Sequence, residues 1–349
     1  MTFTEDMDKT QALADWLDRN CANPGAGALT LSPLSGGSSG TVLRLRRGAL
    51  RAVLRTVGTP PRADSLKALT REAQVLRALA PTPVPHPRFI AFCEDPAVLG
   101  SPFLLMAEVQ GWTGSENPPD TLGDPEGLKR ETTFALIDGL AALAQQDPQA
   151  LGLGGFGHPE GFLERQADRW KTLMDRHRAH PDYGDRALPG FDRIGAWLKR
   201  KRPEMQRVSL IHGDMSFSNV MFSKTARPVR LAAIIDWEIS TLGDPLLDLG
   251  RALYPFPSQD GTPGVSLQID HSGYPPREEL AARYAEKVGL GVASLDYYMV
   301  LSMYKLAALI EFNHVKSMNE PEGSMAHRIA GFVPQLIDGA EQIIRRSAL

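Results

Sequence analysis

The chain has 349 residues, of which 42% are hydrophobic and 23% charged, and its formal net charge is −3. This composition is typical of soluble globular proteins, and the length predicts about two lobes. The small net charge and the lack of a long apolar run argue against a nucleic-acid or membrane partner. Two cysteines are too few for a disulfide framework or a zinc site, and the acidic N-terminus does not resemble a signal peptide. We therefore expect a cytoplasmic protein.

The first third of the chain is predicted to be rich in strands. Residues 8–20 have the periodicity of a short amphipathic helix. Residues 41–57 alternate with period two on both sides of a glycine, which predicts a β-hairpin. The segment 63–80 carries a helical apolar stripe, and Asp64 can cap its start. The apolar run PFLLMAEVQGW then predicts a buried strand that leaves this part of the chain.

Helices dominate the rest of the chain. Helical periodicity is found in six segments, which are 128–146, 160–179, 188–200, 277–288, 294–316 and 325–346. A long Gly/Pro/Ser-rich loop covers 255–276, and such loops are often functional. A strand-rich start followed by helices predicts an α+β fold with two lobes, an N-terminal lobe, 1–107, and a C-terminal lobe, 108–349. A cleft between two lobes is a common ligand site.

The stretch LIHGDMSFSNVMF places polar residues inside an apolar run. Its spacing is H-x-D-x-x-x-x-N, with His212, Asp214 and Asn219, which is the spacing of the protein-kinase catalytic loop. Buried polar groups need partners, so the alternative is a hydrogen-bonded structural loop with a satisfied histidine. We expect Asp248 to brace this loop and Asp244 to cap a helix start.

Two predicted strands follow, NVMF and VRLAAIIDW. If they pair antiparallel, Asn219 at the start of the first converges with Asp236 at the end of the second. A carboxylate and an amide oxygen side by side suit Mg²⁺ bound to a nucleotide, and Glu238 can approach the same metal. Asp214 can then accept or orient a hydroxyl proton, so these residues are sufficient for phosphoryl transfer.

Two charges in the first lobe occupy apolar positions. Arg55 shares a strand face with Val53 and Val57, and Glu72 falls on the buried stripe of the next helix. A cation and a carboxylate placed in this way can pair and aim at phosphates. The alternative is that both side chains extend separately to solvent.

Two glycine-rich stretches are candidates for phosphate binding. The first contains Ser35, Gly36, Gly37 and Ser38 and precedes a strand, so its backbone N–H groups could cover phosphates. The second, GLGGFG at 152–157, matches the dinucleotide fingerprint but follows a helical segment and precedes a proline. The fingerprint needs a strand before it and a helix after it, so we interpret GLGGFG as a turn between helices.

The acceptor is expected to contact the C-terminal lobe. Tyr304, Lys305 and Glu311 lie on or near one face of the helix predicted at 294–316, and the alternative is a core tyrosine with two solvated charges. His271, His314 and His327 have no metal-ligand spacing and are expected to be ordinary surface or core residues.

Several motifs resemble the aminoglycoside phosphotransferase and choline-kinase-like family. HGDMSFSN, IIDWE and LGDPLLDLG carry this resemblance. LSGGSSGTVLRL, TREAQVLRAL and REELAARYAEKVG resemble a bacterial branch that is similar to the kinase domains fused to acyl-CoA dehydrogenases. The resemblance covers nearly the whole chain. It implies a protein-kinase-like fold with a small N-terminal β-sheet lobe plus helix and a larger, mainly helical C-terminal lobe.

The resemblance also assigns roles to residues. It implies that Asp214 is the catalytic base and that Asn219 and Asp236 are Mg²⁺ ligands. It places Arg55 where many members have lysine, with Glu72 as its ion-pair partner.

The same resemblance implies that Met106, Ala107 and Val109 form the hinge that binds adenine through its backbone. Met215 and Ser216 stand where many relatives have Tyr-Arg, on the acceptor side, so the acceptor cannot be transferred from those relatives.

The residues and the resemblance together predict a phosphotransferase that uses ATP and Mg²⁺ to phosphorylate a small-molecule hydroxyl. The acceptor can be aminoglycoside-like or a hydroxyacyl compound. The alternative is a nucleotide-binding pseudokinase or an interaction module without catalysis. Protein kinase activity is disfavoured because the D-F-G and A-P-E signatures are missing. The oligomeric state and the choice between ATP and GTP stay open.

Overall fold

The computed structural model describes residues 7–34, 40–58, 60–225, 227–267 and 269–349. The glycine-rich residues Ser35, Gly36, Gly37 and Ser38 lie outside the described residues. The chain divides into two compact units, one made of residues 1–111 with 232–240 and the other of residues 112–231 with 241–349. Residues 232–240 therefore pack with the N-terminal unit, and the predicted lobes 1–107 and 108–349 stay a prediction about function.

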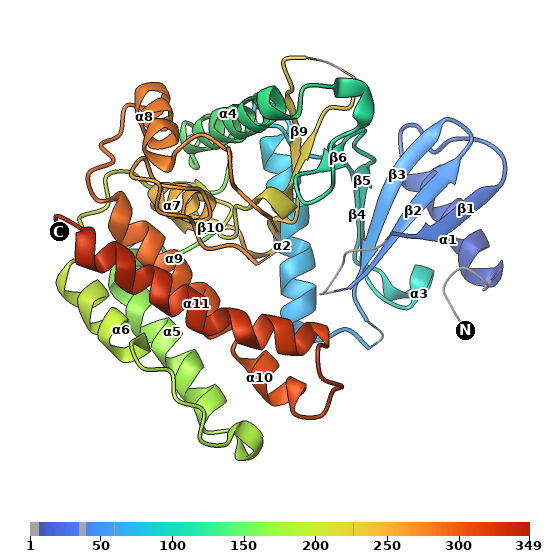
Figure 1. Ribbon diagram of the computed structural model, residues 1–349. Helices are drawn as coiled ribbons and strands as arrows, with labels where there is room; N and C mark the ends of the chain where they lie inside the picture. The colour runs from blue at the N-terminus through green and yellow to red at the C-terminus, as the bar shows by residue number, and fades with distance from the viewer. Residues whose placement is uncertain (1–6, 35–39, 59, 226, 268) are drawn as a thin grey trace. The chain divides into compact units, whose positions relative to one another are not determined.

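The N-terminal unit is built on a five-stranded antiparallel sheet with strand order β1-β2-β3-β5-β4 (Figure 1). Its elements are α1 (Met7–Asn20), β1 (Leu29–Pro33), β2 (Thr41–Arg47), β3 (Leu50–Thr56), α2 (Ala63–Leu79), β4 (Phe89–Cys93), α3 (Pro96–Leu99) and β5 (Phe103–Ala107). The predicted first helix, hairpin, second helix and buried strand are all present.

The hairpin between β2 and β3 turns over two residues. Arg47 pairs with Leu50, which leaves Gly48 and Ala49 in the turn. Gly48 has φ 54°, and a Cβ there would lie 2.6 Å from the carbonyl oxygen of Ala26. Two-residue hairpin turns favour positive φ, so this position requires glycine.

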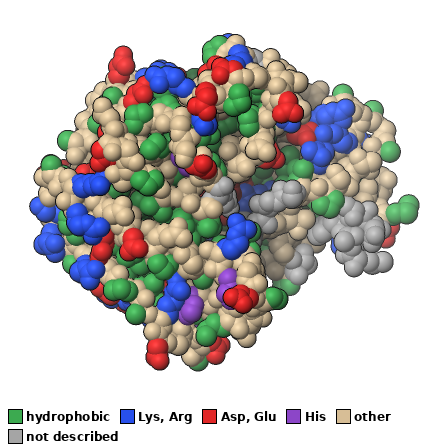
Figure 2. Space-filling model, in the orientation of Figure 1, with side chains coloured by type: hydrophobic (Ala, Val, Ile, Leu, Met, Phe, Trp, Pro, Cys, Tyr) green, Lys and Arg blue, Asp and Glu red, His purple; other side chains and the backbone are tan. Residues whose placement is uncertain are grey.

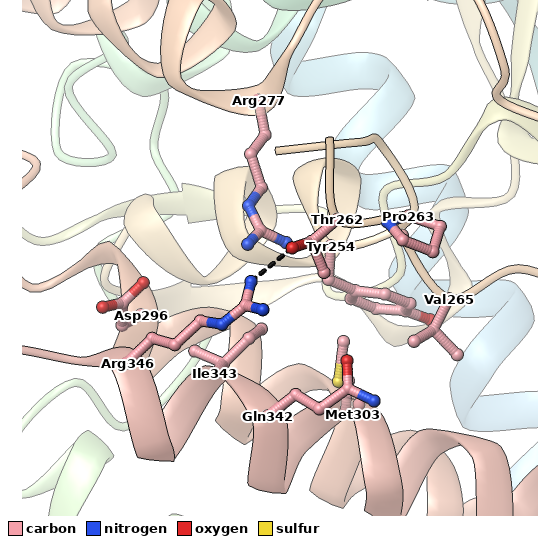
Figure 3. Close-up of a pocket in the computed structure, with 12 residues that line it drawn as sticks. Tyr254, Thr262, Pro263, Val265, Arg277, Asp296, Met303, Gln342, Ile343 and Arg346 are labelled. Atoms are coloured by element: carbon pink, nitrogen blue, oxygen red, sulfur yellow. Dashed lines mark hydrogen bonds between the residues drawn. The ribbon is translucent and has the colours of Figure 1, made fainter. Parts of the chain in front are cut away.

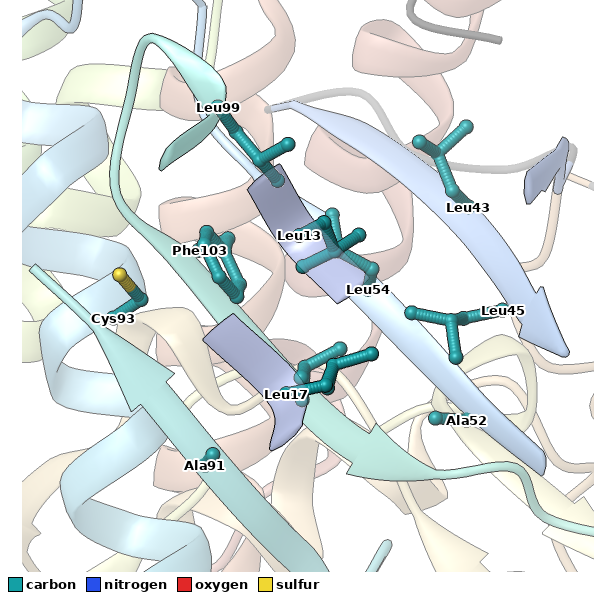
Figure 4. Packing of buried hydrophobic residues seen from close by; sticks show 11 residues of the cluster. Leu13, Leu17, Leu43, Leu45, Ala52, Leu54, Ala91, Cys93, Leu99 and Phe103 are labelled. Carbon is teal, nitrogen blue, oxygen red and sulfur yellow. The ribbon is translucent and has the colours of Figure 1, made fainter. Parts of the chain in front are cut away.

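One face of the sheet is covered by α1. Leu13 and Leu17 of α1 are fully buried and pack with Leu45, Leu54 and Phe103 of the strands (Figure 4). Since side chains alternate along a strand, the neighbours of Leu54 on β3 point to the opposite face. This alternation puts Arg55 on the other side of the sheet from α1.

Helix α2 begins at Ala63 with Arg62 at the N-cap position and no side-chain cap. The prediction that Asp64 caps this helix is therefore wrong, because Asp64 already lies in the first helical turn. A carboxylate in the first turn still interacts favourably with the N–H groups at the helix start.

The C-terminal unit is mainly helical. Its helices are α4 (Pro125–Ala144), α5 (Phe162–Arg178), α6 (Phe191–Arg200), α7 (Leu246–Leu253), α8 (Arg277–Val288), α9 (Leu295–Ile310), α10 (Phe312–Ser317) and α11 (Met325–Arg346). Short strands complete it, namely β6 (Trp112–Thr113), β7 (Ser209–Ile211), β8 (Val220–Phe222) and β10 (Thr241–Gly243). Strand β9 (Leu231–Ile234) begins at the last residue before the segment 232–240, and its other residues belong to that segment.

Helix α9 is the centre of this unit. It contacts α5, α6, α7 and α11, and Figure 1 shows α5 and α6 side by side. Tyr298 and Leu301 are fully buried, and Tyr304 stacks on Phe191 of α6 with ring centroids 4.1 Å apart. Among the helices of the described residues, none is long and apolar enough to cross a membrane.

The predicted helix 294–316 is interrupted. The structure has two helices, α9 and α10, with Glu311 between them. The Glu311 side chain is fully buried, accepts a hydrogen bond from the Tyr183 hydroxyl at 2.7 Å and pairs with Arg186 at 2.9 Å. The break therefore coincides with a buried polar contact to the segment that follows α5, which a one-helix pattern could not reveal.

Candidate functional site

The loop after β7 is hydrogen-bonded to the side chain of Asp248 on α7. The Asp248 carboxylate accepts hydrogen bonds from the backbone N–H of His212 at 2.6 Å and of Gly213 at 2.8 Å. His212 is fully buried, and Gly213 has φ 87°, a conformation that favours glycine. These contacts confirm the predicted brace and give the buried Asp248 carboxylate its hydrogen-bond partners.

The braced loop presents Asp214. The Asp214 side chain is 41% exposed and accepts a hydrogen bond from Arg251 Nε at 2.8 Å. Asn219 Nδ2 donates to the Asp214 backbone carbonyl at 2.8 Å and lies 3.3 Å from its Oδ2. The predicted Asp214 and Asn219 are thus neighbours, and the amide nitrogen of Asn219 faces the loop, so its Oδ1 is the atom left to contact a cation.

Two cations control the charge of Asp214. Burial opposes ionisation, but the Arg251 guanidinium and then the Lys305 ammonium outweigh it, so the pKa of the Asp214 carboxyl lies below its usual range. Burial lowers the pKa of Lys305 to about 8, although Asp214 and Asp248 favour its charge. Lys305 donates to the backbone carbonyl of Gly213. Asp214 is therefore a stable carboxylate at neutral pH.

Arg251 is the residue of this group that the sequence reasoning missed. It lies on α7, three residues after Asp248, so both project toward the same loop. An arginine in the mostly apolar segment LLDLGRALY was the available signal. Lys305 was expected to face the acceptor, and the structure shows that it binds the loop backbone instead.

The N-terminal unit contains a second polar cluster around Arg55. Arg55 Nη1 pairs with Glu72 of α2 at 2.7 Å, which confirms the predicted ion pair. The same nitrogen contacts Asp236 Oδ1 at 2.9 Å, and Nη2 contacts Glu238. The sequence predicted the first contact but not the other two, because residues 232–240 return to this unit from far along the chain.

In this cluster, three carboxylates contact the single guanidinium of Arg55. Glu72 is 2% exposed, and burial raises its pKa to about 7 against the attraction of Arg55. Asp236 is different, because its side chain is 42% exposed and its backbone has φ 68°, rare for a non-glycine residue. The surplus negative charge and the exposed Asp236 carboxylate suit a hard cation.

The donor set fits a nucleotide-bound Mg²⁺ better than an all-protein metal site. Within the described ranges, no three His, Cys, Asp or Glu side chains form a group that could hold a metal ion. Mg²⁺ usually takes one or two carboxylates and completes its shell with phosphates and water. Asn219 and Asp236 belong to different units, so their predicted convergence stays a prediction.

The predicted hinge lies at the end of β5. Met106 pairs with Val53 of β3, and the Ala107 N–H donates to the Arg88 carbonyl at 2.8 Å. The Val109 N–H has no hydrogen-bond partner among the described residues. Val109 is therefore the hinge residue whose backbone donor is available to a ligand.

Two cavities of the C-terminal unit differ in what they could hold. The first, of about 40 Å³, lies beside Arg277, Asp296 and Arg346, and Arg346 is hydrogen-bonded to Thr262 across it (Figure 3). It is large enough for a water molecule only. The second, of about 220 Å³, is lined by Ser216 of the loop after β7 and by residues of α9 and α11, so it is the candidate acceptor cavity.

The predicted acceptor face on α9 is not formed. Glu311 is a buried partner of Tyr183 and Arg186, and Tyr304 is a core residue. His271 is 8% exposed and lies in an aromatic cluster with Phe256, with ring centroids 4.5 Å apart. On the face drawn in Figure 2, acidic and basic side chains are interspersed over the C-terminal unit. The interpretation of residues 152–157 as a turn between helices is confirmed, since GLGGFG forms turns between α4 and α5.

Comparison with known proteins identifies the family. The model of the phosphotransferase enzyme family matches residues 30–286. Acyl-CoA dehydrogenase family member 11 of Gallus gallus is 29% identical over 330 residues, covering 92% of this chain and 41% of the relative. The human protein of the same name is 28% identical, covering 97% and 43%. The chain thus spans about two fifths of the length of these curated relatives.

Solved structures agree on the fold. A structure from Ralstonia eutropha JMP134, whose proposed class is aminoglycoside phosphotransferase, is 25% identical with a TM-score of 0.79, over 97% of this chain and 99% of that one. Aminoglycoside phosphotransferase APH(4)-Ia, solved with ADP and hygromycin B, is 17% identical with a TM-score of 0.58, covering 97% and 99%. The predicted α+β, protein-kinase-like fold is confirmed. The family match covers more than half of the chain, and the chain therefore belongs to the phosphotransferase enzyme family.

Proposed function

We propose that this member of the family transfers the γ-phosphoryl group of ATP, in the presence of Mg²⁺, to a hydroxyl of a small molecule. The observation that carries the proposal is Asp214, an anionic and partly exposed carboxylate on a loop braced by Asp248 and joined to Asn219. In the reaction, the acceptor oxygen bonds to phosphorus, the bond to the β-phosphate breaks, and the hydroxyl proton passes to Asp214 and then to solvent.

The N-terminal lobe, 1–107, would bind the nucleotide. Met106, Ala107 and Val109 would contact adenine through the backbone, and the Val109 N–H is the available donor. Arg55, oriented by Glu72, would contact phosphates. The backbone of residues 35–38 would cover them.

Asn219 and Asp236 would hold Mg²⁺, with Glu238 nearby. When bound, the ion would neutralise charge on the phosphates. Asp236 also contacts Arg55 at 2.9 Å, so this chain couples its proposed phosphate contact to its proposed metal ligand through one carboxylate. The C-terminal lobe, 108–349, would contribute Asp214 and the acceptor site.

The names of related proteins support parts of this proposal. Similar structures were solved with ADP, AMP-PNP or GDP, and some of these also contain hygromycin B or kanamycin. The curated relatives are acyl-CoA dehydrogenase family members. An aminoglycoside-like compound and a hydroxyacyl compound are accordingly both acceptor candidates, and the cytoplasm is the proposed location.

The test is ATP consumption in the presence of a mixture of hydroxylated metabolites, with phosphorylated products detected by mass spectrometry. Wild-type protein should release ADP and form a phosphate monoester, and Asp214→Asn should lose about 10²-fold or more of this rate. Nucleotide binding and the melting temperature of Asp214→Asn serve as fold controls. Nucleotide binding without any turnover by the wild-type chain would instead establish a pseudokinase.

A further inference from the structure

The cavity of about 220 Å³ shares a lining residue with the contacts of the proposed base. Ser216 and Ser218 of the loop after β7 and Arg251 of α7 are among the residues that line it. Arg251 is also the residue that donates to the Asp214 carboxylate at 2.8 Å. Arg251 therefore connects the lining of this cavity to the Asp214 carboxylate.

The lining of this cavity is mostly apolar. Ten of the sixteen described residues that line it are hydrophobic, and they come from the loop after β7, the end of α7 and the loop after it, α9 and α11. Leu306 and Ile310 of α9 and Ile329 and Phe332 of α11 are among the residues that line the cavity. No carboxylate occurs among the described residues that line it, and its one charged side chain is a cation, Arg251.

The remaining polar group of note is His271, which is uncharged. Its Nδ1 lies 3.1 Å from the Ile269 carbonyl, so Nδ1 carries the proton and donates, and Nε2 is an acceptor. Phe217, Phe256 and Tyr274 surround the ring. Burial among them lowers the pKa of His271 to about 4, so the imidazole adds no charge to the cavity at neutral pH.

From this lining we infer that the acceptor is an uncharged alcohol with an apolar body, which fills the cavity and directs its hydroxyl toward Asp214. The inference rests on the proposed function and specifies its substrate class. At about 30 Å³ per non-hydrogen atom, the cavity holds roughly seven such atoms. An ammonium group in the apolar part of the cavity would find no carboxylate among the described lining residues, and the charged side chain that does line it is the cation Arg251, so its burial carries a large cost in free energy. Polycationic aminoglycosides are therefore poor candidates for this site.

Hexan-1-ol and 5-aminopentan-1-ol are matched probes, because they have equal numbers of non-hydrogen atoms and differ in one methyl-to-ammonium exchange. Their binding to the full chain is measured by NMR titration, with and without Mg·ATP. Hexan-1-ol should bind at least about tenfold more tightly than the amine, because only the amine must bury an unpaired charge. Equal or tighter binding of the amine, or no binding of hexan-1-ol, would overturn the inference.

A pair of variants on α9 localises the binding. Leu306→Trp fills the cavity and should weaken hexan-1-ol binding at least about tenfold. Leu309→Trp, at an exposed position on the same helix that does not line the cavity, should leave it unchanged. If Leu306→Trp has a clearly lowered melting temperature, Ile329→Phe on α11 is used as the cavity-filling variant in its place. Unchanged binding in the folded, cavity-filled variant contradicts the assigned location.

An assay with kanamycin distinguishes failure of this inference from failure of the proposed function. Phosphorylation of kanamycin without binding of hexan-1-ol would overturn the inference and leave the phosphotransferase proposal intact. The opposite outcome is a chain that prefers hexan-1-ol, loses this preference in Leu306→Trp and does not bind Mg·ATP. That outcome would support the inferred alcohol site and contradict the proposed function.

Discussion

Arg251 donates a hydrogen bond from Nε to Oδ1 of Asp214 at 2.8 Å, so the proposed base is paired with a guanidinium from α7. Because this pairing helps to keep the pKa of Asp214 below its usual range, Asp214 is ionised throughout the physiological pH range and is a weak base. In the proposed reaction it would therefore contribute mainly by orienting the acceptor hydroxyl, which suits phosphoryl transfer.

Replacing Arg251 by methionine should move the acidic limb of the pH profile of kcat/KM to higher pH. The sign follows because loss of the guanidinium raises the pKa of Asp214, so that more of the carboxyl is protonated at a given acidic pH. The rate at the optimum should also fall, by about 10²-fold, because the carboxylate loses its orientation. Arg251→Lys keeps the charge and should restore much of the acidic limb. An acidic limb that does not move in Arg251→Met would rule out control of Asp214 by Arg251.

Asp236→Asn should abolish the increase in ATP affinity that Mg²⁺ produces. The substitution keeps the size of the side chain and suits the positive φ of 68°, but it removes the anionic oxygen. Isothermal titration with and without Mg²⁺ measures the effect, and the melting temperature checks the fold. Glu286→Gln, an exposed change on α8, is the matched control. A Kd for Mg·ATP equal to that of the wild type would disprove the metal role of Asp236.

Arg55 and Glu72 should show strong coupling in a double-mutant cycle. Arg55→Met alone removes the cation that pairs with the Glu72 carboxylate, which is only 2% exposed. Such a loss typically costs about 3–5 kcal/mol of stability. Arg55→Met combined with Glu72→Leu should cost less than the sum of the two single changes. Urea unfolding of all four proteins gives the coupling energy, and additive losses would show that the two side chains act separately.

The stability of the ligand-free protein should depend on pH through Glu72. The folded-state pKa of about 7 lies above the ordinary glutamate value of 4.5, so between these values the folded state binds a proton that the unfolded state has lost. Stability from this group is complete below about pH 4.5 and declines as the pH rises through 7. The difference corresponds to about 3 kcal/mol. Urea unfolding of Glu72→Gln across this window should show a flatter profile than the wild type, and parallel profiles would contradict the prediction.

Glu311→Ala should destabilise the protein without changing acceptor preference. Removal of the fully buried carboxylate leaves Arg186 and the Tyr183 hydroxyl without their partner, at a cost of about 3 kcal/mol. Glu320→Ala, an exposed change nearby, should have little effect. Unfolding curves measure the loss of stability. An altered ratio of kcat/KM between cationic and neutral acceptors in Glu311→Ala would show instead that Glu311 contributes to acceptor selection.

Local patterns in the sequence were sufficient for the elements and for two of the central contacts. Periodicity predicted α1, the β2–β3 hairpin, α2, α8 and α11, because burial on one face of a helix or strand leaves a repeat in the chain. The Arg55–Glu72 pair and the brace from Asp248 were also predictable. In both cases a charged residue occupied an apolar position, and such a residue requires a partner.

Contacts between distant segments were decided only by the tertiary structure. Arg251 and Lys305 meet the loop of Asp214 from two different helices, and Asp236 and Glu238 reach Arg55 from about 180 residues further along the chain. Glu311 was predicted to face the acceptor, but packing of α9 and α10 against the Tyr183 segment buries it. A sequence records which residues need a partner through burial and charge, whereas the identity of that partner depends on how the helices and strands pack in three dimensions.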